Sequence, residues 1–410
     1  MTFENAKTLL EKYNQEHLLD FYDELNKTEQ SDLLTQIENI DFSLLENLKP
    51  ENTASAKKGK IEPLTKAVTI SDIEQNIDKY RNIGIEEIRN GKVAAVLLAG
   101  GQGTRLGFDK PKGMFNIGVN RELYIFECLI NNLMDVLKVA GVWIPLLIMT
   151  SEKNNEDTIN FFKEKNYFGY NSDYISFFVQ DMAPSVDFDG RIYLESKSRI
   201  SLSPNGNGGW FSSIVRAGLL DKLKSDGVKW LNVFAVDNVL QRIADPAFIG
   251  AVINSGCQSG SKVVAKANPS ERVGAMCLEN GMPSIIEYYE LTDEMANQRM
   301  DDGELAYRFG VTLNYLFMID KLEDINKVKM PVHIVEKKIP YIDKNGCNVS
   351  PEKPNGYKFE TLILDMIHMY DNCLPYEVIR NKEFAPVKNA DGVDSVDTAR
   401  ELLKENGIEI

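Results

Sequence analysis

Histidine and paired cysteine, on which many catalytic and metal sites depend, are scarce in this sequence. Its 410 residues include three histidines and five cysteines, and no two cysteines form a C-x-x-C pair. An odd number of scattered cysteines is typical of reduced, buried thiols rather than of disulfides or a zinc site. Because none of His17, His333 and His368 lies near a nucleophile motif, Ser-His and Cys-His hydrolases are disfavoured.

Positively charged residues and long apolar runs are also scarce. The chain has 46 lysines and arginines against 61 acidic residues, a net charge of −15. Nucleic-acid polymers are bound through summed positive charge, so we expect none as partner, and a nucleotide would need a local basic cluster. The longest apolar run, residues 142–150, is about half a membrane span, and no signal peptide is visible. We therefore expect a cytoplasmic protein without a membrane partner.

One stretch combines a buried strand with glycines and cations. An uninterrupted apolar run, residues 93–99, leads into the glycine-rich residues 100–103, and cations follow at Arg105, Lys110 and Lys112. The apolar run is typical of a strand buried on both faces of a parallel sheet. Glycines let a ligand approach backbone N–H groups, so this stretch predicts an anion cradle, most often for phosphate.

Other readings of these glycines remain open on local pattern alone. A dinucleotide loop needs G-x-G-x-x-G, but after Gly101 and Gly103 the third glycine comes one residue late, at Gly107. A Walker loop ends in G-K-[ST], which does not follow here. The simplest alternative is a tight strand-to-helix turn with solvated lysines.

The hydrophobic pattern changes near residue 89. Apolar residues recur near the helical period in much of residues 1–88, whereas strands and helices alternate afterwards. Alternation predicts an α/β fold with a mostly parallel mixed sheet, helices on both faces, and ligands at the carboxyl ends of strands. The expected strands are Val93–Ala99, Trp143–Met149, Ile175–Val179, Trp230–Val236, Lys262–Ala267 and Thr312–Met318.

Three further segments carry polar residues where a ligand could reach them. Gln180 ends an apolar strand, and its carboxamide could read a uracil edge, although such residues are mostly surface. Asp237 closes the strongly apolar strand at residues 230–236 and would suit Mg²⁺ shared with phosphate oxygens, or a simple capping role. The glycine-rich turn at residues 203–209 surrounds Asn207 and allows close backbone approach to a planar ring.

Residues 98–107, Leu-Ala-Gly-Gly-Gln-Gly-Thr-Arg-Leu-Gly, followed by Pro-Lys-Gly at 111–113, resemble the signature of nucleotide-sugar pyrophosphorylases. The form of the loop most resembles eukaryotic-type UDP-N-acetylhexosamine pyrophosphorylases. The resemblance implies a Rossmann-like nucleotidyltransferase fold with a helical N-terminal segment at 1–88 and a catalytic domain at 89–375. It also implies a short C-terminal segment at 376–410, in place of the further domain into which family members commonly continue.

The resemblance implies a uridylyltransferase that makes UDP-N-acetylglucosamine and pyrophosphate from UTP and N-acetylglucosamine 1-phosphate. The sugar phosphate would attack the α-phosphate in line, and Mg²⁺ or Mn²⁺ would be the cofactor. We expect a monomer. Two alternatives stay open: a pyrophosphorylase for another sugar 1-phosphate, and a non-catalytic sensor of nucleotide sugars.

Site residues carried over from the resemblance fall into four groups. Catalysis is expected of Arg105 and Lys112, and the metal is expected at Asp237. The residues expected to bind the nucleotide are Leu98, Ala99, Gly100, Gly101, Lys112, Gln180, Gly206, Asp237 and Lys358. The residues expected to bind the sugar phosphate are Asn207, Glu287, Tyr288, Asn314 and Lys388.

Overall fold

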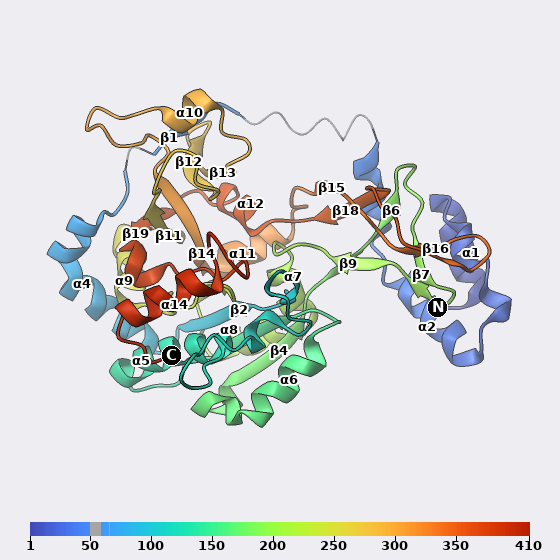
Figure 1. Cartoon of the computed structure of the whole chain (residues 1–410), viewed down its shortest axis with the longest axis horizontal. Coiled ribbons are helices and arrows are strands. Elements are labelled where there is room, and N and C mark those ends of the chain that lie inside the picture. Colours follow the sequence, from blue (N-terminus) through green and yellow to red (C-terminus); the bar gives the residue numbers. More distant parts are fainter. Residues whose placement is uncertain (50–58, 65) are drawn as a thin grey trace. The chain divides into compact units, whose positions relative to one another are not determined.

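A computed structural model describes residues 1–49, 59–64 and 66–410, which fall into two units that are taken one at a time (Figure 1). The sheet unit contains residues 59–180, Trp210–Lys329 and Leu364–Ile410. The small unit contains residues 1–49, Asp181–Gly209 and Met330–Ile363. Within the described residues, every helix is too short or too polar to cross a lipid bilayer.

The sheet unit is built on a mixed sheet in which neighbouring strands follow the order β1-β12-β14-β10-β2-β3-β4. Strands β10, β2, β3 and β4 are parallel, whereas β14 runs antiparallel to β10 and to β11, β11 lies parallel to β19, and β13 pairs with β12. The bounds are β1 Ile61–Pro63, β2 Val93–Leu98, β3 Leu146–Thr150, β4 Ile175–Val179, β10 Trp230–Ala235, β11 Ser259–Ala265, β12 Ala275–Glu279, β13 Met282–Ile286, β14 Phe309–Met318 and β19 Leu374–Glu377.

Strand β2 is buried along its whole length, as its unbroken apolar sequence predicts. Its register pairs Leu98 with Ala235 of β10 on one side and with Met149 of β3 on the other. The carboxyl ends of the three strands therefore meet at one edge of the sheet. We call this the carboxyl edge and the opposite edge, where the strands begin, the amino edge.

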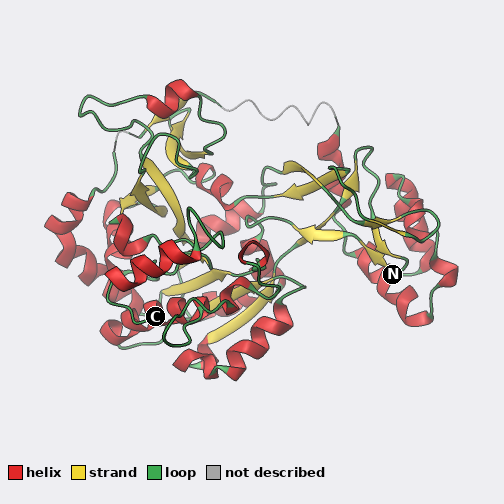
Figure 2. Ribbon diagram, in the orientation of Figure 1, coloured by secondary structure: helices red, strands yellow, loops and turns green. Residues whose placement is uncertain are grey.

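Helices cover both faces of this sheet (Figure 2). On one face, α4, α5, α6, α9 and α14 share a core with Ala95 and Leu97 of β2. On the other face, Trp210 of α7 stacks on Phe317 of β14 with 5.9 Å between ring centroids. The helices are α4 Ile70–Arg89, α5 Ile125–Ala140, α6 Asn155–Glu164, α7 Trp210–Arg216, α8 Leu219–Ser225, α9 Pro246–Ser255, α10 Asp293–Asn297, α11 Ile319–Asn326, α12 Ile363–His368, α13 Arg380–Glu383 and α14 Val396–Glu405. The expected α/β class, with a mostly parallel mixed sheet between helices, is confirmed.

The small unit packs the first helices of the chain against strands from two later segments. Leu10, Leu33 and Ile37 share a core with Ile192 and Phe359. Its elements are α1 Phe3–Tyr13, α2 Lys27–Glu38, β5 Met182–Pro184, β6 Val186–Asp187, β7 Leu194–Ser196, β8 Arg199–Ile200, β9 Leu202–Pro204, β15 His333–Lys337, β16 Tyr341–Ile342, β17 Asn348–Val349 and β18 Gly356–Glu360.

This division differs from the expected helical segment at 1–88. The Gln15 side chain donates to the Gly190 carbonyl at 3.0 Å and accepts from the Ile192 N–H at 2.8 Å, so the first helices belong with a later part of the chain. Helix α4 belongs instead to the sheet unit, where it lies against α9. A Cβ added to Gly84 would lie 2.0 Å from the Pro246 carbonyl oxygen, which shows how closely the two backbones approach.

Candidate active site

The glycine loop leaves the carboxyl edge directly after β2. The Ala99 N–H donates to the Met149 carbonyl at 2.8 Å, and the Asn154 carboxamide donates to the Ala99 carbonyl at 3.0 Å. These bonds fix the last residue before the glycines. Among the described residues, no acceptor faces the N–H groups of Gly100 and Gly101. The loop therefore presents backbone donors to a ligand, as an anion cradle requires.

The loop then folds back so that Lys112 returns to the glycines. A short 3-10 turn, Thr104–Leu106, ends at Gly107, whose φ of 67° lies in the left-handed region. The Gly103 N–H donates to the Lys110 carbonyl at 2.9 Å, and the Lys112 N–H donates to the Gly101 carbonyl at 3.1 Å. Thus the backbone of Lys112 is tied to the glycine that exposes its own N–H.

Gln180 lies against the same loop. It follows β4, its N–H donates to the Thr150 carbonyl at 2.8 Å, and its side chain is buried. A Cβ placed on Gly100 would lie 2.7 Å from Gln180 Nε2, so the carboxamide packs where any other residue at 100 would intrude. Two of the residues predicted to bind the nucleotide are thereby brought together.

Four charged side chains gather where the glycine loop meets the end of β10. Burial lowers the pKa of Lys112 below its ordinary value, and the cations Arg105 and Lys388 lower it further. The Asp237 carboxylate acts in the opposite direction and raises this pKa. Three cations and one carboxylate therefore lie within electrostatic reach of one another.

Lys388 reaches this group because its segment is paired with the residues that follow β10. The Val387 N–H donates to the Asp237 carbonyl at 2.8 Å, and Asn238 forms an antiparallel bridge with Pro386. The Lys388 ammonium also binds the Asp394 carboxylate at 2.9 Å. Counting this partner, three cations face two carboxylates, so the group keeps an excess of positive charge that suits a phosphate ligand.

Lys110, the other cation of the motif, is engaged elsewhere. Its ammonium lies 3.0 and 3.1 Å from the two carboxylate oxygens of Asp157, in the first turn of α6. Both side chains are about half exposed. The sequence offered no signal for this pair, because Asp157 is 47 residues away.

Glu287 and Tyr288 follow β13 on a turn of the sheet unit. The Glu287 N–H donates to a Glu290 carboxylate oxygen at 2.9 Å, and the Glu290 N–H donates to the Glu287 carbonyl at 2.9 Å. Tyr288 is 42% exposed, and its ring lies 5.2 Å from that of Tyr289, centroid to centroid.

Asn314, expected to contact the sugar, is bonded inside the sheet. It lies in β14 opposite Phe234 of β10 and is fully buried, with no exposed surface. Its Oδ1 accepts from Asn232 at 2.8 Å, and its Nδ2 donates to Gln241 Oε1 at 3.3 Å and to the Arg242 carbonyl at 3.2 Å. Because its polar atoms are satisfied inside the sheet, Asn314 has a structural role, and its contact with the sugar stays a prediction.

Gly206, Asn207 and Lys358 belong to the small unit, where they lie on adjoining segments. Gly206 has a φ of 70°, and a Cβ there would lie 2.2 Å from the Thr361 carbonyl oxygen. Asn207 Oδ1 accepts from the Ile363 N–H at 3.0 Å. Lys358 lies on β18 opposite Val335, three residues before Thr361. Gly206 and Asn207 therefore also stabilise this turn.

Residues that could hold a metal ion are few at the carboxyl edge. Within the described part of the chain, His, Cys, Asp and Glu form no group of three or more suited to an ion. Asp237 would contribute one half-buried carboxylate beside the cations. This fits Mg²⁺, which commonly takes one or two carboxylates and completes its shell with phosphate oxygens and water.

Sequence reasoning missed the residue next to Asp237. The Asn238 side chain donates to the Glu383 carbonyl at 2.8 Å and accepts from the Ala385 N–H at 2.9 Å. It therefore fastens the segment that carries Lys388. An asparagine immediately after the predicted metal ligand, at the end of an apolar strand, was the available signal.

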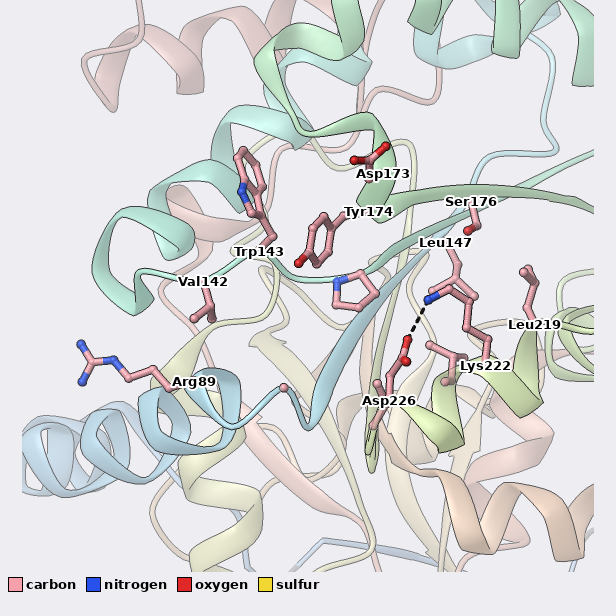
Figure 3. Close-up of a pocket in the computed structure, with 14 residues that line it drawn as sticks. Arg89, Val142, Trp143, Leu147, Asp173, Tyr174, Ser176, Leu219, Lys222 and Asp226 are labelled. Atoms are coloured by element: carbon pink, nitrogen blue, oxygen red, sulfur yellow. Dashed lines mark hydrogen bonds and ion pairs between the residues drawn. The ribbon is translucent and has the colours of Figure 1, made fainter.

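A separate cavity of about 760 Å³ lies at the amino edge (Figure 3). It is lined by residues at the starts of β2, β3, β4 and β10, among them Gly91, Trp143, Tyr174 and Val228. None of the residues predicted to bind nucleotide, metal or sugar lines it.

The sequence of this chain is similar to those of several known proteins. A family model described as UTP–glucose-1-phosphate uridylyltransferase matches residues 42–405. UDP-N-acetylglucosamine pyrophosphorylase of Saccharomyces cerevisiae is 35% identical over 423 residues, covering 97% of this chain and 88% of the yeast protein. UDP-N-acetylhexosamine pyrophosphorylase-like protein 1 of Homo sapiens is 34% identical over 424 residues, covering 98% of this chain and 83% of the human protein.

A solved structure is similar over almost the whole chain. The uridine diphosphate N-acetylglucosamine pyrophosphorylase of Trypanosoma brucei, in complex with an inhibitor, has a TM-score of 0.84 at 29% identity. The match covers 98% of this chain and 84% of the trypanosome protein.

Proposed function

We propose, from the premise that this chain belongs to the UTP–glucose-1-phosphate uridylyltransferase family, that it transfers the uridylyl group of UTP to N-acetylglucosamine 1-phosphate. The products are UDP-N-acetylglucosamine and pyrophosphate. The observation that carries this proposal is the cationic cluster beside open backbone donors at the carboxyl edge. The names of the yeast and trypanosome relatives support the choice of sugar.

The transfer needs positioning and charge neutralisation more than proton transfer. The sugar-phosphate oxygen is already an anion, so it attacks the α-phosphorus of UTP directly while the bond to the departing pyrophosphate breaks. Two anions repel each other on approach, and the excess positive charge of Arg105, Lys112 and Lys388 offsets this repulsion. Donors that already point at the phosphates need no reorganisation as the reaction proceeds.

Roles within this site follow from what each side chain can reach. The N–H groups of Gly100 and Gly101, with Lys112 and Arg105, would stabilise the triphosphate and the leaving pyrophosphate. Gln180, packed against Gly100, would read the uracil edge. Leu98 and Ala99 would border the nucleotide through the backbone that leads into the loop.

The remaining contacts are proposed from the resemblance. Lys388 would hold the sugar 1-phosphate, and Glu287 and Tyr288 would contact the sugar through a carboxylate and a ring face. In the small unit, Gly206 and Lys358 are assigned to the nucleotide and Asn207 to the sugar.

Asp237 would hold the Mg²⁺ or Mn²⁺ ion. When bound, the ion supplies charge neutralisation across the phosphate oxygens. The half-buried carboxylate of Asp237 after β10 supports this role, because Mg²⁺ commonly takes one or two carboxylates from a protein. We also place the protein in the cytoplasm as a monomer, and its five free cysteines fit a reducing compartment.

The direct test is to incubate the pure protein with UTP, Mg²⁺ and a panel of sugar 1-phosphates, and to follow pyrophosphate release and UDP-sugar formation. We expect turnover to be fastest with N-acetylglucosamine 1-phosphate and to stop when a chelator removes the metal ion. Faster turnover with another sugar phosphate would change the substrate, whereas binding of UDP-sugar without pyrophosphate release would make the protein a sensor.

A further inference from the structure

A buried lysine lies behind the cationic cluster and takes no part in the roles assigned so far. Lys262, in β11, is 1% exposed. Its ammonium donates to Asp245 Oδ2 at 3.0 Å, to Glu383 Oε2 at 2.5 Å and to the Arg242 carbonyl at 3.2 Å. All three of its protons therefore have acceptors, so the charge is both buried and fully satisfied.

The two carboxyl groups respond differently to sharing this ammonium. Burial favours the protonated form of Asp245, but the Lys262 ammonium and Arg242 outweigh it and lower the pKa of this carboxyl. Burial dominates at Glu383 and raises its pKa. The ammonium thus pairs with an ionised Asp245 and holds Glu383 through a short hydrogen bond.

Glu383 connects this cluster to the residues that face the substrates. Its carbonyl accepts from Asn238 Nδ2 at 2.8 Å, and Asn238 Oδ1 accepts from the Ala385 N–H at 2.9 Å. The Val239 N–H donates to the Ala385 carbonyl at 3.2 Å. Together with the bond from Val387 to the Asp237 carbonyl, these contacts clip residues 383–387 onto residues 237–239. Asp237 and Lys388 flank this clip.

Stability alone is a weak reason for such a cluster. Removing charges from water is costly, and a buried ion pair is often no better for stability than well-packed apolar residues of similar volume. Lys262 lies inside β11 directly before Val263 and Val264, which are apolar and fully buried. A precise geometric task accounts better for a lysine at this position.

We propose that Lys262 is a positioning residue for the transfer reaction, which anchors Glu383 and Asp245 and thereby sets the spacing between Asp237 and Lys388. This rests on the proposed function, in which Asp237 holds the metal ion and Lys388 holds the sugar 1-phosphate. Lys262 itself touches neither substrate. A displacement of about 1 Å at such groups can cost about 10²-fold in rate.

The test compares Lys262→Met with a matched variant, Lys92→Met. Lys92 is a less buried lysine, with a side chain 30% exposed and paired with Glu87 at 2.8 Å, and it lies just before β2 at the amino edge. With folding checked by thermal denaturation, we expect Lys262→Met to lower kcat/KM for the sugar 1-phosphate about 10²-fold. Lys92→Met should leave kcat/KM unchanged. A folded Lys262→Met enzyme with wild-type kcat/KM would overturn the proposal.

Double variants separate positioning from a general loss of structure. If Lys262 acts through the two groups at the ends of the clip, Lys262→Met should add little to the loss caused by Lys388→Ala or by Asp237→Asn. A merely structural role predicts that the losses multiply in both backgrounds, and that result contradicts positioning.

The milder Glu383→Gln keeps the size of the side chain and can replace Lys262→Met if the latter does not fold. It should show the same non-additive loss with Lys388→Ala, and additive losses would again count against positioning. An inactive wild-type enzyme would refute the proposed function itself. Failure of the Lys262 variants in an active enzyme refutes only the positioning role.

Discussion

The carboxyl and amino edges of the sheet differ in how the charges of their cations are matched. At the carboxyl edge, Lys112 is held beside two other cations in a site whose burial and charge lower its pKa. At the amino edge, the cations that line the cavity already have protein partners. Lys222 pairs with Asp226 at 2.8 Å, as the dashed line in Figure 3 marks, and Arg89 Nε donates to the Ala140 carbonyl at 3.0 Å.

This difference distinguishes the cavity at the amino edge from the candidate active site at the carboxyl edge. The amino edge has the better-defined cavity, with the rings of Trp143 and Tyr174 on its wall (Figure 3). Yet Lys222 is paired with Asp226, and the Arg89 guanidinium already donates to two main-chain carbonyls, so an anion gains less by entering. The carboxyl edge offers backbone donors without acceptors and an excess of positive charge, which only a bound anion would balance. Unmatched charge is therefore the better guide to function in this fold.

Lys112→Ala is the strongest test of this difference between the carboxyl and amino edges. Removing one preorganised charge from the transition state typically costs about 10²- to 10³-fold in rate, and we expect a loss of this size. Arg105→Ala should fall by the same order. The measurement is steady-state pyrophosphate release, with circular dichroism to show that both variants are folded. Wild-type rates in either variant would show that the cations of the carboxyl edge do not take part in the reaction.

Much of the carboxyl edge could be predicted from sequence because its signals are local. The apolar run before Gly100 specifies a strand buried on both faces, and parallel strands place the end of that strand at the same edge as the end of the strand before Asp237. That the two ends are neighbours depends on the strand order, in which β2 pairs with β10, and only the structure gives this order.

The parts that could not be predicted depend on contacts between distant residues. No local pattern indicates that Gln15 bonds to residues near 190, so the sequence does not show that the first helices belong with a later part of the chain. Asn314 looks like a ligand residue in sequence, but its neighbours Asn232 and Gln241 come from another strand and the loop beyond it. Burial of an amide among other amides becomes visible only once the strands are paired.

Lys112→Met is expected to have a smaller effect, on the free energy of unfolding. The sign of this change tests whether the positive charge at the carboxyl edge is unmatched. The folded pKa of Lys112 lies below its ordinary value, so between these two pKa values the unfolded chain binds more protons and the stability of the wild-type protein rises with pH. Below that range, the buried ammonium destabilises the ligand-free protein. Lys112→Met should therefore raise the free energy of unfolding at neutral pH, by on the order of 0.5 kcal/mol or more, while abolishing most activity.

Urea denaturation of Lys112→Met and wild type at pH 7 and in the alkaline range measures this effect. The advantage of the variant should shrink as the pH rises and the wild-type lysine loses its proton. A variant that is less stable than wild type at pH 7 would show that Lys112 is not held against an electrostatic cost. The unmatched charge would then no longer set the carboxyl edge apart.

The smallest effect is expected from Lys222→Ala at the amino edge. This lysine and Asp226 form an exposed pair one helical turn apart, and such pairs contribute about 0–1 kcal/mol. We expect the free energy of unfolding to change by less than about 0.5 kcal/mol and kcat/KM to stay within roughly twofold of wild type. A tenfold loss of activity in this variant would mean that the cavity at the amino edge communicates with catalysis. Matched charges would then be no sign of an inactive edge, and the contrast between the two edges would fail.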